Sequence, residues 1–152
     1  MTENVPADTP GAYILDQYLA DFSIENPGGR VSAGQASELV LGMDVAVAAA
    51  ALTDAADGKE KYGVQIALAM PARLGERIIF LIELRYRVNV QLQGVDAANV
   101  GALLHVQIPN AVFPALKAIV ETNGAFAGYP EISLLPIDFA GLFSARAQGQ
   151  EP

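Results

Sequence analysis

Few residues in this sequence could do chemistry. It has one histidine, His105, and no cysteine. A catalytic histidine works with a nucleophile or an orienting carboxylate, and the neighbours of His105 in the sequence, LLHVQI, are apolar. This setting favours a structural or surface role for His105. The lack of cysteine excludes disulfides, zinc–thiolate sites and cysteine nucleophiles.

The carboxylates form no catalytic or metal-binding pattern either. Residues 54–60, DAADGKE, faintly resemble a calcium loop, but the ligand spacing is wrong. Asp57 and Gly58 lie between two apolar runs, which predicts a hairpin turn instead. The sequence has neither a P-loop nor a Gly-x-Gly-x-x-Gly motif. We therefore expect a protein that is not an enzyme, with no catalytic residue, no metal site and no cofactor.

Composition limits the partners. The formal net charge is −8 and the isoelectric point is about 4.4. Such a chain repels nucleic acid and anionic membranes, whereas a basic protein partner fits. The N-terminal segment lacks the basic start and apolar run of a secretory signal. The longest apolar stretch, residues 39–52, is shorter than the roughly 20 residues that a spanning helix needs. We expect a cytoplasmic protein without insertion into a membrane.

Four segments have the alternation or apolar runs of strands, at residues 17–26, 38–53, 62–74 and 77–93. In the first, Phe22 and Ile24 share one face, and Asp21, Ser23 and Glu25 share the other. The last strand places Ile78, Phe80, Ile82, Leu84, Tyr86, Val88 and Val90 on one face. Short connections between the strands favour an antiparallel meander with one covered face and one face in water.

Helices should supply the cover. Residues 97–107 and 111–123 have helical character, with Pro114 expected in or near a first turn, and Asp138 is a fair N-cap for a terminal helix. The predicted fold class is α+β, a four-stranded antiparallel sheet with helices packed on one side. We expect a flexible tail at residues 1–12, one domain at residues 13–143 and a short tail at residues 144–152.

Two surface features remain to be explained. Asp21, Glu25 and Glu83 give the outer strand faces an acidic character, which an ordinary solvated sheet would also show. The C-terminal third is unusually aromatic for a thin cover, with Phe113, Phe126, Tyr129, Phe139 and Phe143. These rings suit an ordinary core, an oligomer interface or an apolar groove for unfolded peptide, and periodicity alone favours the first two.

A family resemblance adds to this interpretation. The segments IPNAVFP (residues 108–114) and YPEISLLPIDFAGLF (residues 129–143) resemble two signatures of the bacterial export chaperone SecB family, C-P-x-L-L-F-P and G-F-P-x-L-x-L-x-P-x-x-F-x-x-L-[FY]. The segment YLADFSIENP (residues 18–27) is similar to the first strand of that family, and FLIE (residues 80–83) to its F-x-x-E element. The matches occur in the family's order and cover most of the chain.

The resemblance implies an ATP-independent holdase that binds unfolded precursor proteins, keeps them competent for translocation and delivers them to the SecA motor. It implies a homotetramer built as a dimer of dimers. The positions matching the SecA-binding face are Asp21, Glu25, Leu81 and Glu83. The aromatic residues matching the client groove are Phe80, Phe139 and Phe143.

Some residues depart from the family pattern. Ile108 replaces a cysteine, Tyr86 and Arg87 replace frequent glycines, and the connection at residues 28–37 lacks the usual aromatic residue. Arg85 and Arg87 share a strand face with Glu83, which weakens its acidic field, and only nine residues follow Phe143. The alternative is a SecB-like chaperone dedicated to another client, such as a toxin–antitoxin pair. The sequence leaves the clients and the retention of the tetramer open.

Overall fold

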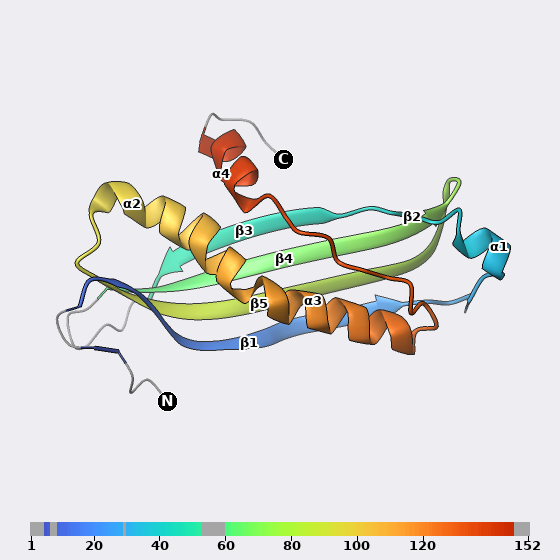
Figure 1. Ribbon diagram of the computed structural model, residues 1–152, viewed down its shortest axis with the longest axis horizontal. Coiled ribbons are helices and arrows are strands. Elements are labelled where there is room, and N and C mark those ends of the chain that lie inside the picture. The colour runs from blue at the N-terminus through green and yellow to red at the C-terminus, as the bar shows by residue number, and fades with distance from the viewer. Residues whose placement is uncertain (1–4, 7–8, 29, 53–59, 148–152) are drawn as a thin grey trace.

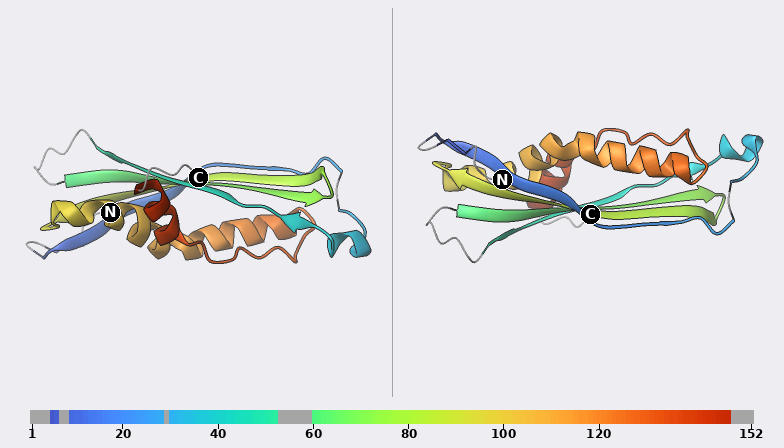
Figure 2. Two further views of the ribbon diagram at one scale, coloured as in Figure 1. Left: turned by 90° about the horizontal axis from the view of Figure 1, so that it is seen from above. Right: turned by 90° about the horizontal axis from the view of Figure 1, so that it is seen from below.

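The computed structural model describes residues 5–6, 9–28, 30–52 and 60–147. Five strands form one antiparallel sheet: β1 (Gly11–Glu25), β2 (Val40–Leu41), β3 (Asp44–Ala51), β4 (Glu60–Leu74) and β5 (Arg77–Gln93). The helical elements are α1 (Ala33–Ala36), α2 (Ala97–Ala102), the π-helical turn η1 (Leu103–Gln107), α3 (Ile108–Phe126) and α4 (Phe139–Ala147). The helical elements other than α1 follow the sheet in the sequence, and the long helix lies over one face of the sheet (Figures 1 and 2). The predicted α+β class with an antiparallel sheet is confirmed.

The strand order differs from the predicted meander. β3, β4 and β5 are consecutive neighbours, but β1 pairs with β5, the last strand in the sequence, and not with β3. The connection at residues 26–39, which we call the crossover segment, is too long for a hairpin and contains α1. It therefore carries the chain from one edge of the sheet to the other (Figure 1). The hairpin turn expected at Asp57 and Gly58 lies outside the described residues.

One sheet face forms the core. Val64, Ile66, Leu68 and Met70 of β4 are buried, as the alternation predicted, together with seven apolar residues of β5 from Phe80 to Leu92. The prediction was wrong for Ile78, which is 48% exposed, while Ile79 is 7% exposed. The pairing shifts between Ala72 and Arg73, and Ile79 is skipped, so a β-bulge reverses the alternation at this end of the hairpin.

The strand predicted at residues 38–53 is divided into β2 and β3. Gly42 interrupts it and donates its backbone N–H to the carbonyl of Pro71 at 2.8 Å. A Cβ atom at position 42 would lie 3.3 Å from the Pro71 ring, so this close approach favours glycine. Both short strands pair with β4 and together form the second edge of the sheet.

The two predicted helices at residues 97–107 and 111–123 are parts of one continuous helix from Ala97 to Phe126. Pro114 is inside α3, not in its first turn, and Pro109 occupies the early position instead. In a regular α-helix the Pro109 ring would collide with the carbonyl four residues earlier, that of His105. The π-helical turn η1 lies just before this point, and such turns accommodate a break in the hydrogen-bond ladder.

The long helix has the length and apolar composition of a membrane span. Its buried side chains, however, belong to the core cluster that it forms with the sheet, as those of a core helix do: Leu104, Ile108, Val112, Leu116 and Val120. From Phe126 the chain turns back along residues 127–138, which we call the strap, and reaches α4 beside β3 (Figure 1). The predicted N-cap is confirmed, since Asp138 Oδ1 accepts a hydrogen bond from the Gly141 N–H at 2.9 Å.

Candidate functional site

The first candidate site is an apolar depression between the crossover segment, the strap and the β4–β5 hairpin, which we call the crossover groove. Its volume is about 330 Å³. The crossover segment contributes Ala36 and Leu39, and the sheet contributes Leu41, Ala72 and Phe80. Met43 lines the groove from the link between β2 and β3, and the strap contributes Tyr129, Glu131, Ile132, Ser133 and Leu135. Leu135 is 66% exposed, so one wall presents apolar surface to solvent.

Two aromatic rings form the floor of the crossover groove. Phe80 and Tyr129 are each 2% exposed, and their ring centroids are 4.5 Å apart. The Tyr129 hydroxyl accepts a hydrogen bond from the backbone N–H of Val31 at 3.2 Å. Tyr129 thus joins the strap to the sheet through its ring and to the crossover segment through its hydroxyl.

The second candidate site, which we call the α4 hollow, lies between β3, η1 and α4. Its volume is about 360 Å³, and its lining residues are Val45, Ala46, Val47, Ala48, His105, Phe139, Leu142, Phe143 and Arg146. The His105 ring stacks on Phe143 at 5.3 Å. Arg146 donates to the backbone carbonyl of Val47 at 2.8 Å, which satisfies one group on the outer edge of β3.

His105 has a structural role in this hollow. Its Nδ1 donates to the carbonyl of Gly101 at 3.0 Å, one turn earlier in the helix. A Cβ atom at position 101 would lie 3.1 Å from the Phe143 ring, so glycine there lets the ring approach the helix closely. Among the described residues, no group of three or more His, Asp or Glu side chains could hold a metal ion.

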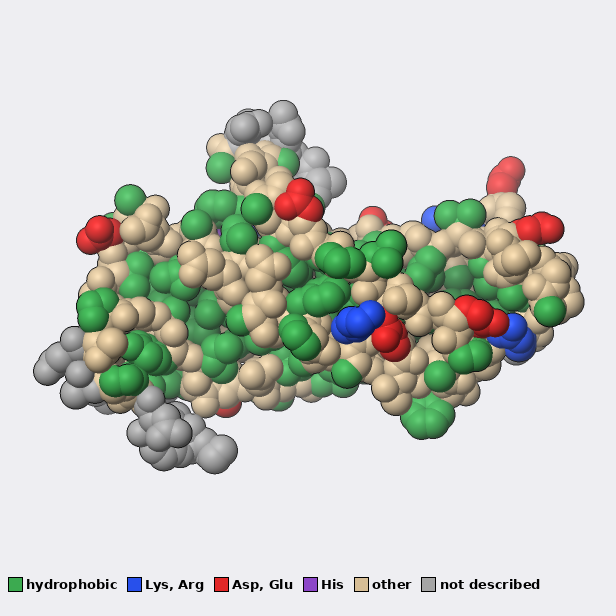
Figure 3. Space-filling view, viewed as in Figure 1, with side chains coloured by type: hydrophobic (Ala, Val, Ile, Leu, Met, Phe, Trp, Pro, Cys, Tyr) green, Lys and Arg blue, Asp and Glu red, His purple; other side chains and the backbone are tan. Residues whose placement is uncertain are grey.

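The groove and the hollow follow each other along the β2–β3 edge. A third depression, of about 620 Å³, borders both sites, because it shares Met43 with the groove and Val45, Ala46 and Leu142 with the hollow. It opens on the uncovered sheet face and carries charged side chains, so it is not an apolar site. Apolar side chains are exposed over the strap and this edge of the molecule (Figure 3). An extended chain laid along this edge would pass from one apolar site to the next.

The client residues predicted from the sequence are divided between these sites. Phe80 lies in the crossover groove, whereas Phe139 and Phe143 lie in the α4 hollow. Sequence reasoning missed the aliphatic walls Leu39, Leu41, Met43, Ile132 and Leu135, and it noted Tyr129 without assigning it to the groove. Apart from Leu41, which lies in β2, they share one signal: each is an apolar residue in a connection that has no regular strand or helix to bury it.

The predicted SecA-binding positions lie together on the uncovered sheet face. Glu25 pairs with Leu81 and Ser23 pairs with Glu83 across β1 and β5, so Asp21, Glu25, Leu81 and Glu83 form one group on adjacent strands. The three carboxylates are exposed. Asp44, which the sequence analysis did not single out, joins them from β3 in the row Ser23–Glu83–Ala69–Asp44.

Two arginines share this face. Arg85 lies 3.9 Å from the Asp21 carboxylate, at the limit of an ion pair, and both side chains are largely exposed. Arg87 donates from Nε to Gln65 at 3.0 Å. The depression on this face is lined by Asp21, Asp44, Glu83 and Arg85, three carboxylates and one guanidinium, so it keeps a net negative charge.

Two carboxylates with lowered pKa values, Glu121 and Glu131, hold segments that lack regular secondary structure. The Arg30 hydrogen bond lowers the pKa of Glu131 below the ordinary range. Lys117, 2.5 Å from Glu121, and the Leu134 N–H, which donates to it at 2.9 Å, lower the pKa of Glu121. Glu121 therefore attaches the strap to α3 as a carboxylate. In both cases the cause is a structural hydrogen bond.

Known proteins resemble this chain over most of its length. The sequence profile of the family described as preprotein translocase subunit SecB matches residues 6–150. The protein-export protein SecB of Hyphomonas neptunium is 32% identical over 141 residues, which cover 93% of this chain and 81% of the relative. Its counterpart in Parvibaculum lavamentivorans is 29% identical over 144 residues, covering 93% and 82%.

A solved structure supports the same fold. The SecB-like chaperone of Mycobacterium tuberculosis, solved in complex with a ChAD peptide from the HigA1 antitoxin, superposes with a TM-score of 0.62. The match covers 83% of this chain and 90% of the other, at 15% sequence identity. Taken with the profile match over residues 6–150, these relatives establish that the chain belongs to the SecB family of preprotein translocase subunits.

Proposed function

We propose that this protein is an export chaperone that binds unfolded precursor proteins in the cytoplasm, keeps them from folding or aggregating, and transfers them to the SecA motor. It works as a holdase, without ATP and without catalysis. The observation that carries the proposal is the pair of apolar sites along the β2–β3 edge, the crossover groove and the α4 hollow. Relatives named protein-export protein SecB over most of the chain support the same role.

The chemistry of this edge suits unfolded chains. Most of the side chains that line the groove and the hollow are aliphatic or aromatic, so they accept many apolar segments with modest affinity. Within the described residues β3 pairs only with β4, so its outer backbone groups, other than the Val47 carbonyl that Arg146 contacts, can add hydrogen bonds to an extended client. Phe80 supports such a client from the groove floor, and Phe139 and Phe143 contribute from the hollow.

The uncovered sheet face is the proposed SecA contact. Asp21, Glu25 and Glu83 place exposed carboxylates around Leu81 on two adjacent strands. A basic element of the motor protein would be attracted to them, with the main effects on association rate and register. Arg85 offsets part of this field. Because the carboxylates are exposed, the interaction should weaken with added salt.

We also propose that the protein works as a homotetramer, a dimer of dimers. β1 is the other sheet edge, and it exposes Ile14, Tyr18 and Leu19 by 38%, 45% and 40%. An unpaired edge with exposed apolar side chains is a ready surface for pairing with a second copy.

The test is a titration of the purified protein with an unfolded precursor and then with SecA, with mass measured by light scattering. We expect tetramers that bind the precursor and then SecA. Glu83→Lys should abolish SecA binding and leave precursor binding unchanged, whereas Leu39→Asp should weaken precursor binding and spare SecA binding. Glu76→Lys, in the exposed β4–β5 turn, is the matched charge control.

The outcomes separate the alternatives. Precursor binding without SecA binding would reject the export role and leave a SecB-like holdase with a dedicated client. A protein that neither binds the precursor nor suppresses its aggregation would reject the holdase function altogether.

A further inference from the structure

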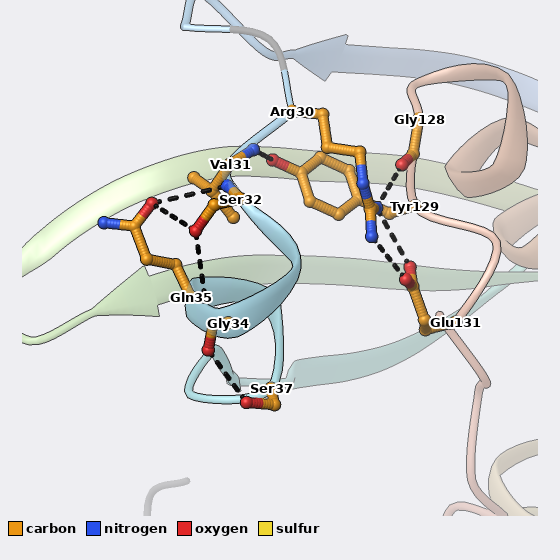
Figure 4. A network of polar contacts seen from close by, with 9 residues as sticks. All are labelled: Arg30, Val31, Ser32, Gly34, Gln35, Ser37, Gly128, Tyr129 and Glu131. Atoms are coloured by element: carbon orange, nitrogen blue, oxygen red, sulfur yellow. Dashed lines mark hydrogen bonds and ion pairs between the residues drawn. The ribbon is translucent and has the colours of Figure 1, made fainter.

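We propose that Arg30 is a positioning residue of the crossover groove: it fixes the separation of the two groove walls, and so the lifetime of a bound client, without touching the client. The proposal rests on the proposed holdase function. It starts from a polar network that ties the crossover segment to the strap (Figure 4).

Arg30 makes several contacts at once. Its guanidinium binds both carboxylate oxygens of Glu131, at 3.2 and 2.6 Å, and it donates to the backbone carbonyl of Gly128. It also lies 5.2 Å above the Tyr129 ring. A single surface ion pair contributes little, but a two-point Arg–carboxylate contact reinforced by a carbonyl and a ring defines one geometry.

Neighbouring residues extend the same connection. The backbone N–H of Val31 donates to the Tyr129 hydroxyl at 3.2 Å, and Asn26 donates to the carbonyl of Ala127 at 2.9 Å. Both hydrogen bonds join the crossover segment to the strap, and their partners are 98 and 101 residues apart in the sequence. The strap has no regular secondary structure between Gly128 and Asp138, and α1 has four residues. Neither wall can therefore hold its position through backbone hydrogen bonds alone.

The network leads directly to the residues that line the groove. Val31 directly precedes Ser32, the N-cap of α1, which forms a capping box with Gln35. A fixed Arg30 and Val31 thus orient α1, which carries Ala36 and leads into Leu39 on one wall. On the other side, Glu131 precedes Ile132 on the opposite wall. Arg30, paired with Glu131, bridges these two walls.

The experiment measures client release and local opening in the same variants. The probe is an unfolded, cysteine-alkylated protein carrying a fluorophore, and its dissociation rate is followed by stopped flow. Amide hydrogen exchange of Val31 reports on the crossover segment directly. The variants are Arg30→Met, Arg30→Lys and the charge swap Arg30→Glu with Glu131→Arg. Arg87→Met, on the uncovered sheet face, is the control.

We expect Arg30→Met to speed both probe dissociation and Val31 exchange by roughly tenfold, the scale produced by losing one charge-assisted contact. Arg30→Lys keeps the charge but not the two-point geometry and should lie between Arg30→Met and wild type. The charge swap should restore part of both rates, and Arg87→Met should change neither.

Two results would overturn the positioning role. Faster Val31 exchange with unchanged probe dissociation would show that the Arg30 contacts do not control how long the groove retains a client. Faster probe dissociation with unchanged Val31 exchange would show that Arg30 contacts the client instead. If the wild type binds no probe, the holdase proposal fails, and Val31 exchange alone still decides whether Arg30 holds the crossover segment.

Discussion

The crossover groove and the α4 hollow are apolar sites of similar volume, about 330 and 360 Å³, on one sheet edge, but they are held together differently. The groove walls are a crossover segment and a strap with little regular structure, joined by side chains such as Arg30, Tyr129 and Glu131. The hollow is walled by a strand and a nine-residue helix that support their own backbones. An apolar site whose walls lack regular secondary structure thus needs more side-chain contacts to hold those walls in place.

The largest expected effect tests the groove floor. Tyr129→Ala removes a ring that is 2% exposed and in tilted contact with Phe80, so the free energy of unfolding should fall by about 3–5 kcal/mol, the usual cost of truncating a buried aromatic residue. Chemical denaturation measures this change. Phe126→Ala, at a position that is 84% exposed, should change stability by less than about 0.5 kcal/mol. If both variants lowered the free energy of unfolding equally, Tyr129 would not be the buried floor of the crossover groove.

A variant of the hollow should act more locally. Phe143→Ala removes the ring that stacks on His105, and because the ring is only partly buried we expect a loss of about 2 kcal/mol. Amide exchange should increase mainly in α4, while that of Val31 in the crossover segment stays unchanged. Increased exchange at both places would mean that the two sites are coupled rather than separately held.

Gly124 in α3 tests how tightly the strap packs against this helix. Gly124→Ala gains about 1 kcal/mol of helix propensity, but its Cβ would lie 2.8 Å from Ile132 Cδ1 and 3.2 Å from Ile132 Cβ. Such crowding costs about 1–3 kcal/mol, so we expect a net loss of about 1 kcal/mol by thermal or chemical unfolding. A stabilised variant would show that the strap yields freely at this point.

Acid should weaken the contacts that Glu121 and Glu131 make with the strap and the crossover segment more than the contacts of the α4 hollow. The pKa of Glu121 and of Glu131 is lowered in the folded state, so their stabilising effect is present above the ordinary glutamate pKa of about 4.3. This stabilisation is lost as the pH falls below the ordinary glutamate pKa and through the lowered pKa values of the folded state. Measured against pH, the free energy of unfolding should decline in this window, and Glu121→Gln should flatten the decline. The effect is small because Glu131 is exposed and Glu121 is only half-buried, so water screens both contacts.

Sequence reasoning predicted the strands best where alternation is long. β4 and β5 were placed almost to the residue, because a strand with one buried face repeats its pattern every second residue. Asp138 was a recognisable cap because capping depends on a few adjacent residues. The grouping of Asp21, Glu25, Leu81 and Glu83 followed from alternation and family resemblance together, and their SecA role stays a prediction.

Only the tertiary structure decided how distant segments meet. The pairing of β1 with β5 depends on a crossover whose length does not specify a destination, and the bulge at Ile79 and the internal Pro114 are local irregularities that periodicity does not encode. The separation of Phe80 from Phe143, and the contact of Arg30 with Glu131, arise because the strap turns back over the sheet. By itself the sequence determined which faces are apolar, through its two-residue period. The fold alone determined which apolar faces lie beside each other, because that depends on long-range packing.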